Sequence, residues 1–182
     1  MGGGPRSVSI DPREVPDLLK VPTPISHATV GYALGLWTQR APPVPRVCIA
    51  AAACAALPDI DLLFSSVIEH RAITHSLAFA FVIALVSAAV VPPGTNGQQS
   101  RWRIAVVLGL ATLSHGFLDA LSSYSYGIEF FAPFSNQRYR FPWTPLGDPA
   151  GRLSRQLVQE GLVVLLPALL AVWLGRRVRR SR

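Results

Sequence analysis

The chain has 182 residues, of which 50% are hydrophobic and only 15% are charged, and its mean hydropathy is +0.35. This composition excludes a disordered chain, and two cysteines without a glycine period exclude a disulfide-stapled or collagen-like scaffold. Seventeen basic residues against ten acidic ones give a net charge of +7. The length allows one domain or two very small ones, so the main question is whether the chain lies in a membrane.

Five apolar stretches predict helices, in the order 25–37, 47–57, 77–91, 104–121 and 161–175. A membrane-spanning helix needs about 20 mostly apolar residues, which most of these stretches reach only with their polar ends. Because five such stretches leave too little polar sequence to cover them, we expect an all-α, polytopic membrane bundle with four to five apolar helices. A soluble bundle with very apolar core helices is the alternative. The expected organisation is a polar N-terminal segment (1–23), a membrane-embedded domain (24–175) and a basic C-terminal tail (176–182).

Alternation of five spans sorts the charges onto two sides of the membrane. One side, called the basic side here, holds the loops near 40–46 and 92–103 and the tail from 176, with nine arginines and no acid. The acidic side holds all ten acids and the other eight basic residues. Short, purely basic loops next to span ends are typical of the cytoplasmic face. We therefore expect a multi-pass protein of the inner (plasma) membrane with a cytoplasmic tail, which favours anionic lipid over nucleic acid as its contact.

Seven ionisable residues lie at the acidic side or in the predicted membrane close to it, in the strings SHATVG, LPDID, EHRAITHS and LSHGFLDALSSY. They are His27, Asp59, Asp61, His70, His75, His115 and Asp119. Each of the first three strings has a plain alternative, an interfacial histidine or a turn with capping acids. The fourth favours function, because His115 and Asp119 share one helix face and each ionisable group inside a span costs about 3 kcal/mol.

The four strings together predict a metal centre at the acidic side. Alternating spans bring them to one face, as ligands from several helices meet in bundle metalloproteins. Mixed imidazole and carboxylate ligands suit zinc, and alternatively manganese or iron, better than calcium. His70 and His75 share such a site only if the chain bends between them or His70 precedes the helix. Seven candidates exceed the four ligands of a structural zinc site, which leaves two ions, or one ion with a base and supporting carboxylates.

The strings SHATVG, LPDID, HRAITHS and SHGFLDALSSYSYG, with the later PFSNQRYRFPW, resemble the YdjM-like family over residues 24–150. That family is described as LexA-binding, inner-membrane-associated, metal-dependent hydrolases. The resemblance implies that all seven residues match the family's polar positions and that 24–175 is a hydrolase-like domain. The residues themselves do not indicate LexA binding or any other protein partner.

We therefore expect a hydrolase whose metal-activated water attacks a phosphoester or acyl bond of a lipid-like, amphiphilic substrate. Asp61 or Asp119 is the expected base, and Arg71 or Arg138 is expected to hold the anionic group. A cation or proton pathway and a scaffold with structural His–Asp pairs are the alternatives, although a pathway would need polar groups on the basic side too. The aromatic and basic segment 124–147 predicts a loop at the membrane–water interface, or a surface that receives a lipid head group.

Overall fold

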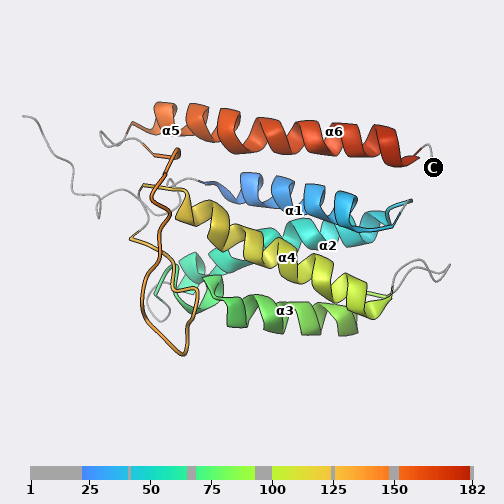
Figure 1. Ribbon diagram of the computed structural model, residues 1–182, viewed down its shortest axis with the longest axis horizontal. Helices are drawn as coiled ribbons and strands as arrows, with labels where there is room; N and C mark the ends of the chain where they lie inside the picture. The colour runs from blue at the N-terminus through green and yellow to red at the C-terminus, as the bar shows by residue number, and fades with distance from the viewer. Residues whose placement is uncertain are drawn as a thin grey trace, which may run out of the picture.

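The computed structural model describes residues 22–40, 42–64, 69–92, 100–123, 126–147 and 152–180 (Figure 1). Its helical elements are α1 (Pro24–Thr38), α2 (Pro45–Ala56), the 3-10 helix η2 (Leu57–Phe64), the 3-10 turn η3 (Ile73–His75), α3 (Leu77–Val90), α4 (Arg101–Ala120), α5 (Leu153–Glu160), the π-helical turn η4 (Gly161–Leu165) and α6 (Leu166–Arg180). Within the described ranges there is no strand, only two isolated β-bridges. The all-α prediction is confirmed. The predicted polar segment 1–23 lies outside the described residues except for its last two.

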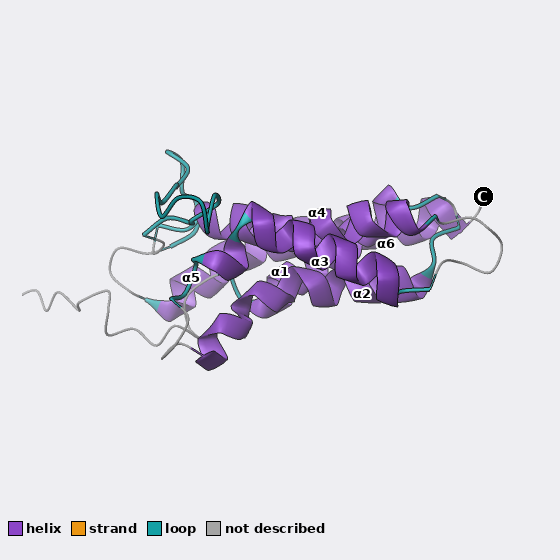
Figure 2. Ribbon diagram, turned by 90° about the horizontal axis from the view of Figure 1, so that it is seen from below, coloured by secondary structure: helices purple, strands orange, loops and turns teal. Residues whose placement is uncertain are grey.

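The helices lie side by side and run in alternating directions along the long axis of the molecule (Figures 1 and 2). As a result, the starts of α1, α3 and α5 and the ends of η2 and α4 gather at one end of the bundle, on the left of Figure 1. The ends of α1, α3 and α6 and the starts of α2 and α4 lie at the other end. This is the alternation that the sequence predicts, with the four polar strings at one end.

Three helical segments of the described chain are long and apolar enough to cross a membrane. They are Pro45–Phe64, Arg101–Ala120 and Leu153–Arg179, and α3 is a shorter apolar helix. The second predicted stretch becomes long enough because η2 continues α2 without a break. The last predicted stretch, 161–175, is also longer than expected, since the polar α5 precedes it and the basic tail stays helical to Arg180. The helical membrane bundle is confirmed.

Small residues allow α1 and α2 to pack with close backbones. A Cβ atom at Gly31 would lie 2.4 Å from the carbonyl oxygen of Ala51, and one at Gly35 would lie 2.9 Å from the Cα of Cys48. Helices in lipid associate mainly through such close contact, because burial of apolar surface gives little advantage there. The helix α2 also packs on α4, where small and branched side chains form the core: Val47, Ala51, Ala55, Ile104, Val107, Leu108 and Ala111.

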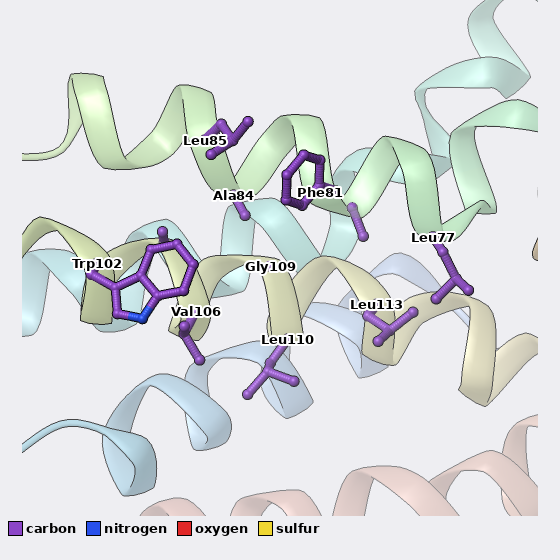
Figure 3. Close-up of a pocket in the computed structure, with 11 residues that line it drawn as sticks. Leu77, Phe81, Ala84, Leu85, Trp102, Val106, Gly109, Leu110 and Leu113 are labelled. Carbon is purple, nitrogen blue, oxygen red and sulfur yellow. The ribbon is translucent and has the colours of Figure 1, made fainter.

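An apolar groove of about 240 Å³ runs between α3 and α4 (Figure 3). Phe81 and Leu85 form one wall, and Trp102, Val106 and Leu110 form the other. Gly109 lets the two helices approach at the floor, because a Cβ atom there would lie 2.9 Å from the Cβ of Ala84. The groove therefore offers only hydrocarbon and aromatic surface along the helix axes.

Candidate metal centre

The seven predicted residues lie at the end of the bundle where α1, α3 and α5 start, which we call the acidic end; they come from α1, η2, the segment between η2 and α3, and α4. His27 lies in the first turn of α1, Asp59 and Asp61 in η2, and His115 and Asp119 in the last turns of α4. The α-helix α2 changes into the 3-10 helix η2 beside Pro58, because a proline cannot donate the backbone hydrogen bond that would continue the α-helix. The tighter 3-10 helix then carries both carboxylates beneath the end of α4, with which η2 is in contact.

The segment between η2 and α3 bends sharply at Arg71, whose φ of 66° lies in the left-handed region. This conformation is uncommon outside glycine and costs about 1–3 kcal/mol, so it occurs where the surroundings enforce it. It places His70 in a turn before the helix, while His75 ends η3 and Ser76 caps α3 by accepting a hydrogen bond from the Phe79 amide (3.1 Å). The bend required by the spacing of His70 and His75 is present.

The inner side chains lie within a few ångströms of one another. His27 Nε2 is 3.3 Å from Asp119 Oδ1, His75 Nε2 is 3.5 Å from Asp119 Oδ2, and His115 Nε2 is 3.3 Å from Asp59 Oδ1. The rings of His27 and His115 stack at 3.7 Å. In three groups, each residue offers one ligand atom within 4.8 Å of the others: His27–Asp59–His115, Asp59–His70–His75 and His75–His115–Asp119.

Hydrogen bonds on the outside of the cluster fix three of the four imidazoles. His115 Nδ1 donates to the carbonyl oxygen of Ala55 (2.7 Å), and His70 Nδ1 donates to Asp61 Oδ1 (2.7 Å). His75 Nδ1 lies 3.0 Å from Thr74 Oγ1, whose hydroxyl donates to Asp61 Oδ2 (2.7 Å). A ring that donates through Nδ1 presents the lone pair of Nε2 to the other side, which is how metal-bound histidines are commonly held.

Several imidazole nitrogens of the cluster have no hydrogen-bond partner although they are buried. They are both ring nitrogens of His27, Nε2 of His75 and Nε2 of His115. A buried polar atom without a partner costs about 1–3 kcal/mol, and a cation bound between the rings would satisfy one nitrogen of each ring that it contacts. Burial lowers the pKa of His75 to about 4, so its ring is neutral and able to bind a cation at pH 7. The donor set of the cluster therefore fits a transition-metal ion.

The other predicted residues divide between this cluster and the loop beside it. Arg71 is buried and donates from Nε to Asp119 Oδ2 (2.9 Å), so its guanidinium belongs to the cluster. Arg138 instead forms ion pairs with Glu69 and with Glu129, the latter at 3.0 Å. Of the two arginines, only Arg71 therefore lies in the cluster, while Arg138 is engaged by two carboxylates beside it.

The aromatic and basic segment, described over 126–147 and called the aromatic loop here, covers the acidic end of the bundle. Its backbone reaches the cluster. Glu129 donates its amide hydrogen to the Arg71 carbonyl (3.2 Å), and Phe130 accepts from the Leu77 amide (2.9 Å). Phe134 and Trp143 are 89% and 69% exposed, as is typical of rings at a membrane interface.

The sequence interpretation missed Thr74, which connects His75 with Asp61, and Glu160, which binds the residue before α1. Two features of the sequence could have indicated them: Thr74 is next to the predicted ligand His75, and Glu160 is an acid directly before the apolar stretch 161–175.

Comparison with known proteins agrees with the sequence resemblance. The model of the family described as "YdjM inner membrane protein" matches residues 23–179. The chain is 32% identical over 167 residues to the Inner membrane protein YbcI of Escherichia coli (strain K12), an alignment that covers 85% of this chain and 92% of that protein. No solved structure matches the chain. The four polar strings thus lie inside the matched region, and the chain belongs to the YdjM family of inner membrane proteins.

Proposed function

We propose that this protein is a membrane-bound, metal-dependent hydrolase whose centre is the His–Asp cluster at the acidic end of the bundle. The observation that carries the proposal is the set of buried imidazole nitrogens without partners, which lie beside Asp59 and Asp119. A zinc ion, or alternatively manganese or iron, would supply a water with its pKa lowered toward about 7 for attack on a phosphoester or acyl bond. The three candidate ligand groups share residues, so they correspond to one or two ions and not to three.

The residues of the chain divide the remaining tasks. Asp61 accepts hydrogen bonds from His70, from Thr74 and from the Arg71 amide (3.3 Å), so its role is to orient ligands rather than to move protons. Asp119 is the better candidate for the base, because it faces His27, His75 and His115. Arg71 would hold an anionic group of the substrate next to Asp119.

The surroundings of the cluster support an amphiphilic substrate. One end of the apolar α3–α4 groove is formed by Leu77 and Leu113, each two residues along the chain from a histidine of the cluster. A lipid-like molecule could place its chain along this groove and its head group at the bundle end. The charge distribution supports a cytoplasmic tail and a centre near the outer face of the inner membrane.

Metal content is the direct test of this proposal. We would purify the protein in detergent without chelators and measure bound zinc, manganese and iron in the wild type, His75→Ala and Asp119→Ala. Glu69→Gln is the matched control, since Glu69 is an exposed acid that pairs with Arg138 outside the cluster. We expect one or two ions per chain in the wild type and control, and a loss of metal in both cluster variants.

Activity is then measured with a chromogenic phosphodiester and a chromogenic acyl ester. Turnover that depends on added metal and falls at least 100-fold in Asp119→Ala would support hydrolysis of the corresponding bond. A wild-type protein without metal would contradict the metal centre and favour the scaffold with structural His–Asp pairs. Bound metal with no turnover of either probe would argue for a structural or transport role of the ion.

A further inference from the structure

We infer that Glu160 is a positioning residue for the metal centre and acts on His27 through Thr23, an inference that rests on the function proposed above. Glu160 lies at the end of α5, inside the predicted membrane-spanning segment Leu153–Arg179, and is 3% exposed. An acid inside such a segment is costly and is normally kept where it pairs or serves a function. Its position, 137 residues along the chain from Thr23, makes it a link between distant helices.

The contact between Glu160 and Thr23 replaces an ordinary helix cap. Thr23 is the N-cap residue of α1, yet its side chain does not cap its own helix. Instead, the Thr23 amide and hydroxyl both donate to Glu160 Oε1, each at 2.6 Å. A threonine at this position usually accepts a hydrogen bond from the first turn. Here it is held by a carboxylate from another helix, so the start of α1 is fixed to α5.

Thr23 passes this constraint directly to His27. The His27 amide donates to the Thr23 carbonyl oxygen (3.2 Å), and so does the Ser26 amide (3.0 Å). His27 is also the histidine of the cluster that most needs a backbone constraint. The rings of His70, His75 and His115 are each held by a hydrogen bond through Nδ1, whereas neither ring nitrogen of His27 makes a hydrogen bond and its Nε2 has only the 3.3 Å contact with Asp119 Oδ1. Its ring position therefore depends on the first turn of α1, on stacking against His115 and on the contact with Asp119.

The π-helical turn η4 explains how Glu160 faces α1. Four buried residues along α5, η4 and the first part of α6 are spaced four apart: Gln156, Glu160, Val164 and Ala168. In a straight α-helix three steps of four residues would rotate this row by about 120°, since each turn has 3.6 residues. The wider turn over Gly161–Leu165 keeps the row facing its neighbour, and both η4 and α6 contact α1. Such π turns are frequent at functional positions.

The test is the metal affinity of full-length variants in detergent, measured with Co²⁺ by competition against a chelator. Glu160→Leu removes the acceptor, and we expect an affinity 10–100-fold below that of the wild type, as for other residues that orient ligands. Glu160→Gln keeps an oxygen that can accept both hydrogen bonds and is expected to stay within threefold of the wild type. Gln159→Leu is the matched control: it breaks a contact of the neighbouring side chain with the Gly147 amide.

A double-mutant cycle separates positioning of His27 from a general loss of structure. In a His27→Ala background, Glu160→Leu should lower the affinity by less than twofold, because the residue it positions is absent. If Glu160→Leu does not fold, Thr23→Val replaces it in the same cycle and removes one of the two hydrogen bonds, with an expected loss of about threefold to tenfold. The visible spectrum of bound Co²⁺ should change in Glu160→Leu and not in Gln159→Leu.

The outcomes distinguish this inference from the proposed function. A wild-type protein that binds no Co²⁺ would overturn both. Wild-type binding that survives unchanged in Glu160→Leu and Thr23→Val, or equal losses with and without His27, would overturn the positioning role alone and leave the metal centre standing.

Discussion

The histidines of the cluster are held in different ways, and these differences decide which single substitutions matter. His115 is fixed by a carbonyl oxygen of α2, and His70 is fixed by the carboxylate of Asp61. His75 makes its Nδ1 hydrogen bond with a hydroxyl, that of Thr74, which in turn donates to Asp61; the same Nδ1 lies 3.4 Å from Asp61 Oδ2. A hydroxyl can be removed without loss of volume, which makes Thr74 a sharper probe of ligand orientation than the ligands themselves.

Thr74→Val should weaken metal binding about 10–100-fold while the protein stays folded, because His75 loses the group that orients its ring. Metal affinity by chelator competition and thermal unfolding in detergent check the two halves of this prediction. Thr112→Val is the control, as Thr112 is also buried but lies away from the cluster: its hydroxyl donates to the Leu108 carbonyl oxygen (2.9 Å) and contacts the Cys54 thiol. Equal affinity in Thr74→Val and the wild type would contradict the relay through the hydroxyl.

Arg71 has a buried ion pair with Asp119 and a left-handed backbone conformation, and two variants can separate their effects on stability. Both Arg71→Ala and Arg71→Gly leave the buried Asp119 without its guanidinium, and breaking a buried pair in this way costs about 3–5 kcal/mol. Glycine also relieves the left-handed backbone conformation, so Arg71→Gly should be about 1–2 kcal/mol more stable than Arg71→Ala. Thermal unfolding in one detergent measures both. An alanine variant as stable as the glycine variant would show that the φ of 66° carries no strain.

At the scale of single residues, the sequence could predict the members of the cluster but not their connections. His115 and Asp119 follow from helical spacing and from the cost of ionisable groups in an apolar stretch. Whether Asp61 binds a cation or orients a histidine depends on the bend at Arg71, and no periodicity encodes that bend. The role of Arg138 was open for the same reason, since its partner Glu69 is 69 residues away in the chain.

At the scale of helices, contact between α1 and α2 depends on two glycines that present no side chain. Hydropathy finds both helices but is blind to this requirement, because glycine and alanine differ little in apolarity. Gly31 faces the backbone of α2 so closely that a methyl group has no space. Close packing of this kind sets the position of α1, and therefore the position of His27 at its start.

The same substitution should lower stability at Gly31 but not at Gly161. Gly31→Ala would place a Cβ 2.5 Å from the Cβ of Ala55, so α1 must move and the protein should lose about 1–3 kcal/mol of stability. At Gly161 no atom beyond its chain neighbours and the backbone of its own helix lies within 4 Å of the added Cβ, so Gly161→Ala should be neutral or slightly stabilising. Thermal unfolding in detergent compares them, and equal midpoints would contradict the close packing of α1 and α2.

Helix lengths were predicted less well than helix positions. The helix over the stretch 47–57 continues through η2, because a 3-10 helix tolerates Pro58. The last helical segment, formed by α5, η4 and α6, begins eight residues before the apolar stretch 161–175. Sequence LSRQLVQE carries no apolar run, so hydropathy could not find α5. The structure adds these polar turns at the acidic end, where they carry Asp59, Asp61 and Glu160 into reach of the other helices.

At the scale of the whole molecule, the distribution of charge predicts the orientation in the membrane. Phe134 is 89% exposed at the acidic end, and Val178 is 40% exposed near the basic end. In a background with Cys48→Ala and Cys54→Ala, Phe134→Cys should react with a membrane-impermeant maleimide in intact cells whose outer membrane is permeabilised. Val178→Cys should react only after lysis. The reverse pattern would place the His–Asp cluster at the cytoplasmic face.

Arginines at the end of α6 bind the end of α1, at the opposite end of the bundle from Glu160. Arg176 donates to the Tyr32 hydroxyl (3.1 Å), and Arg179 donates to the carbonyl oxygens of Trp37 (3.1 Å) and Gln39. The pair is therefore tied at both ends by polar contacts. An inserted residue in either helix would shift its far end by about 1.5 Å and rotate it by about 100°, so both ties could not form together. Each of the two helices thus sets the permitted length of the other, and changes in length are confined to the loops.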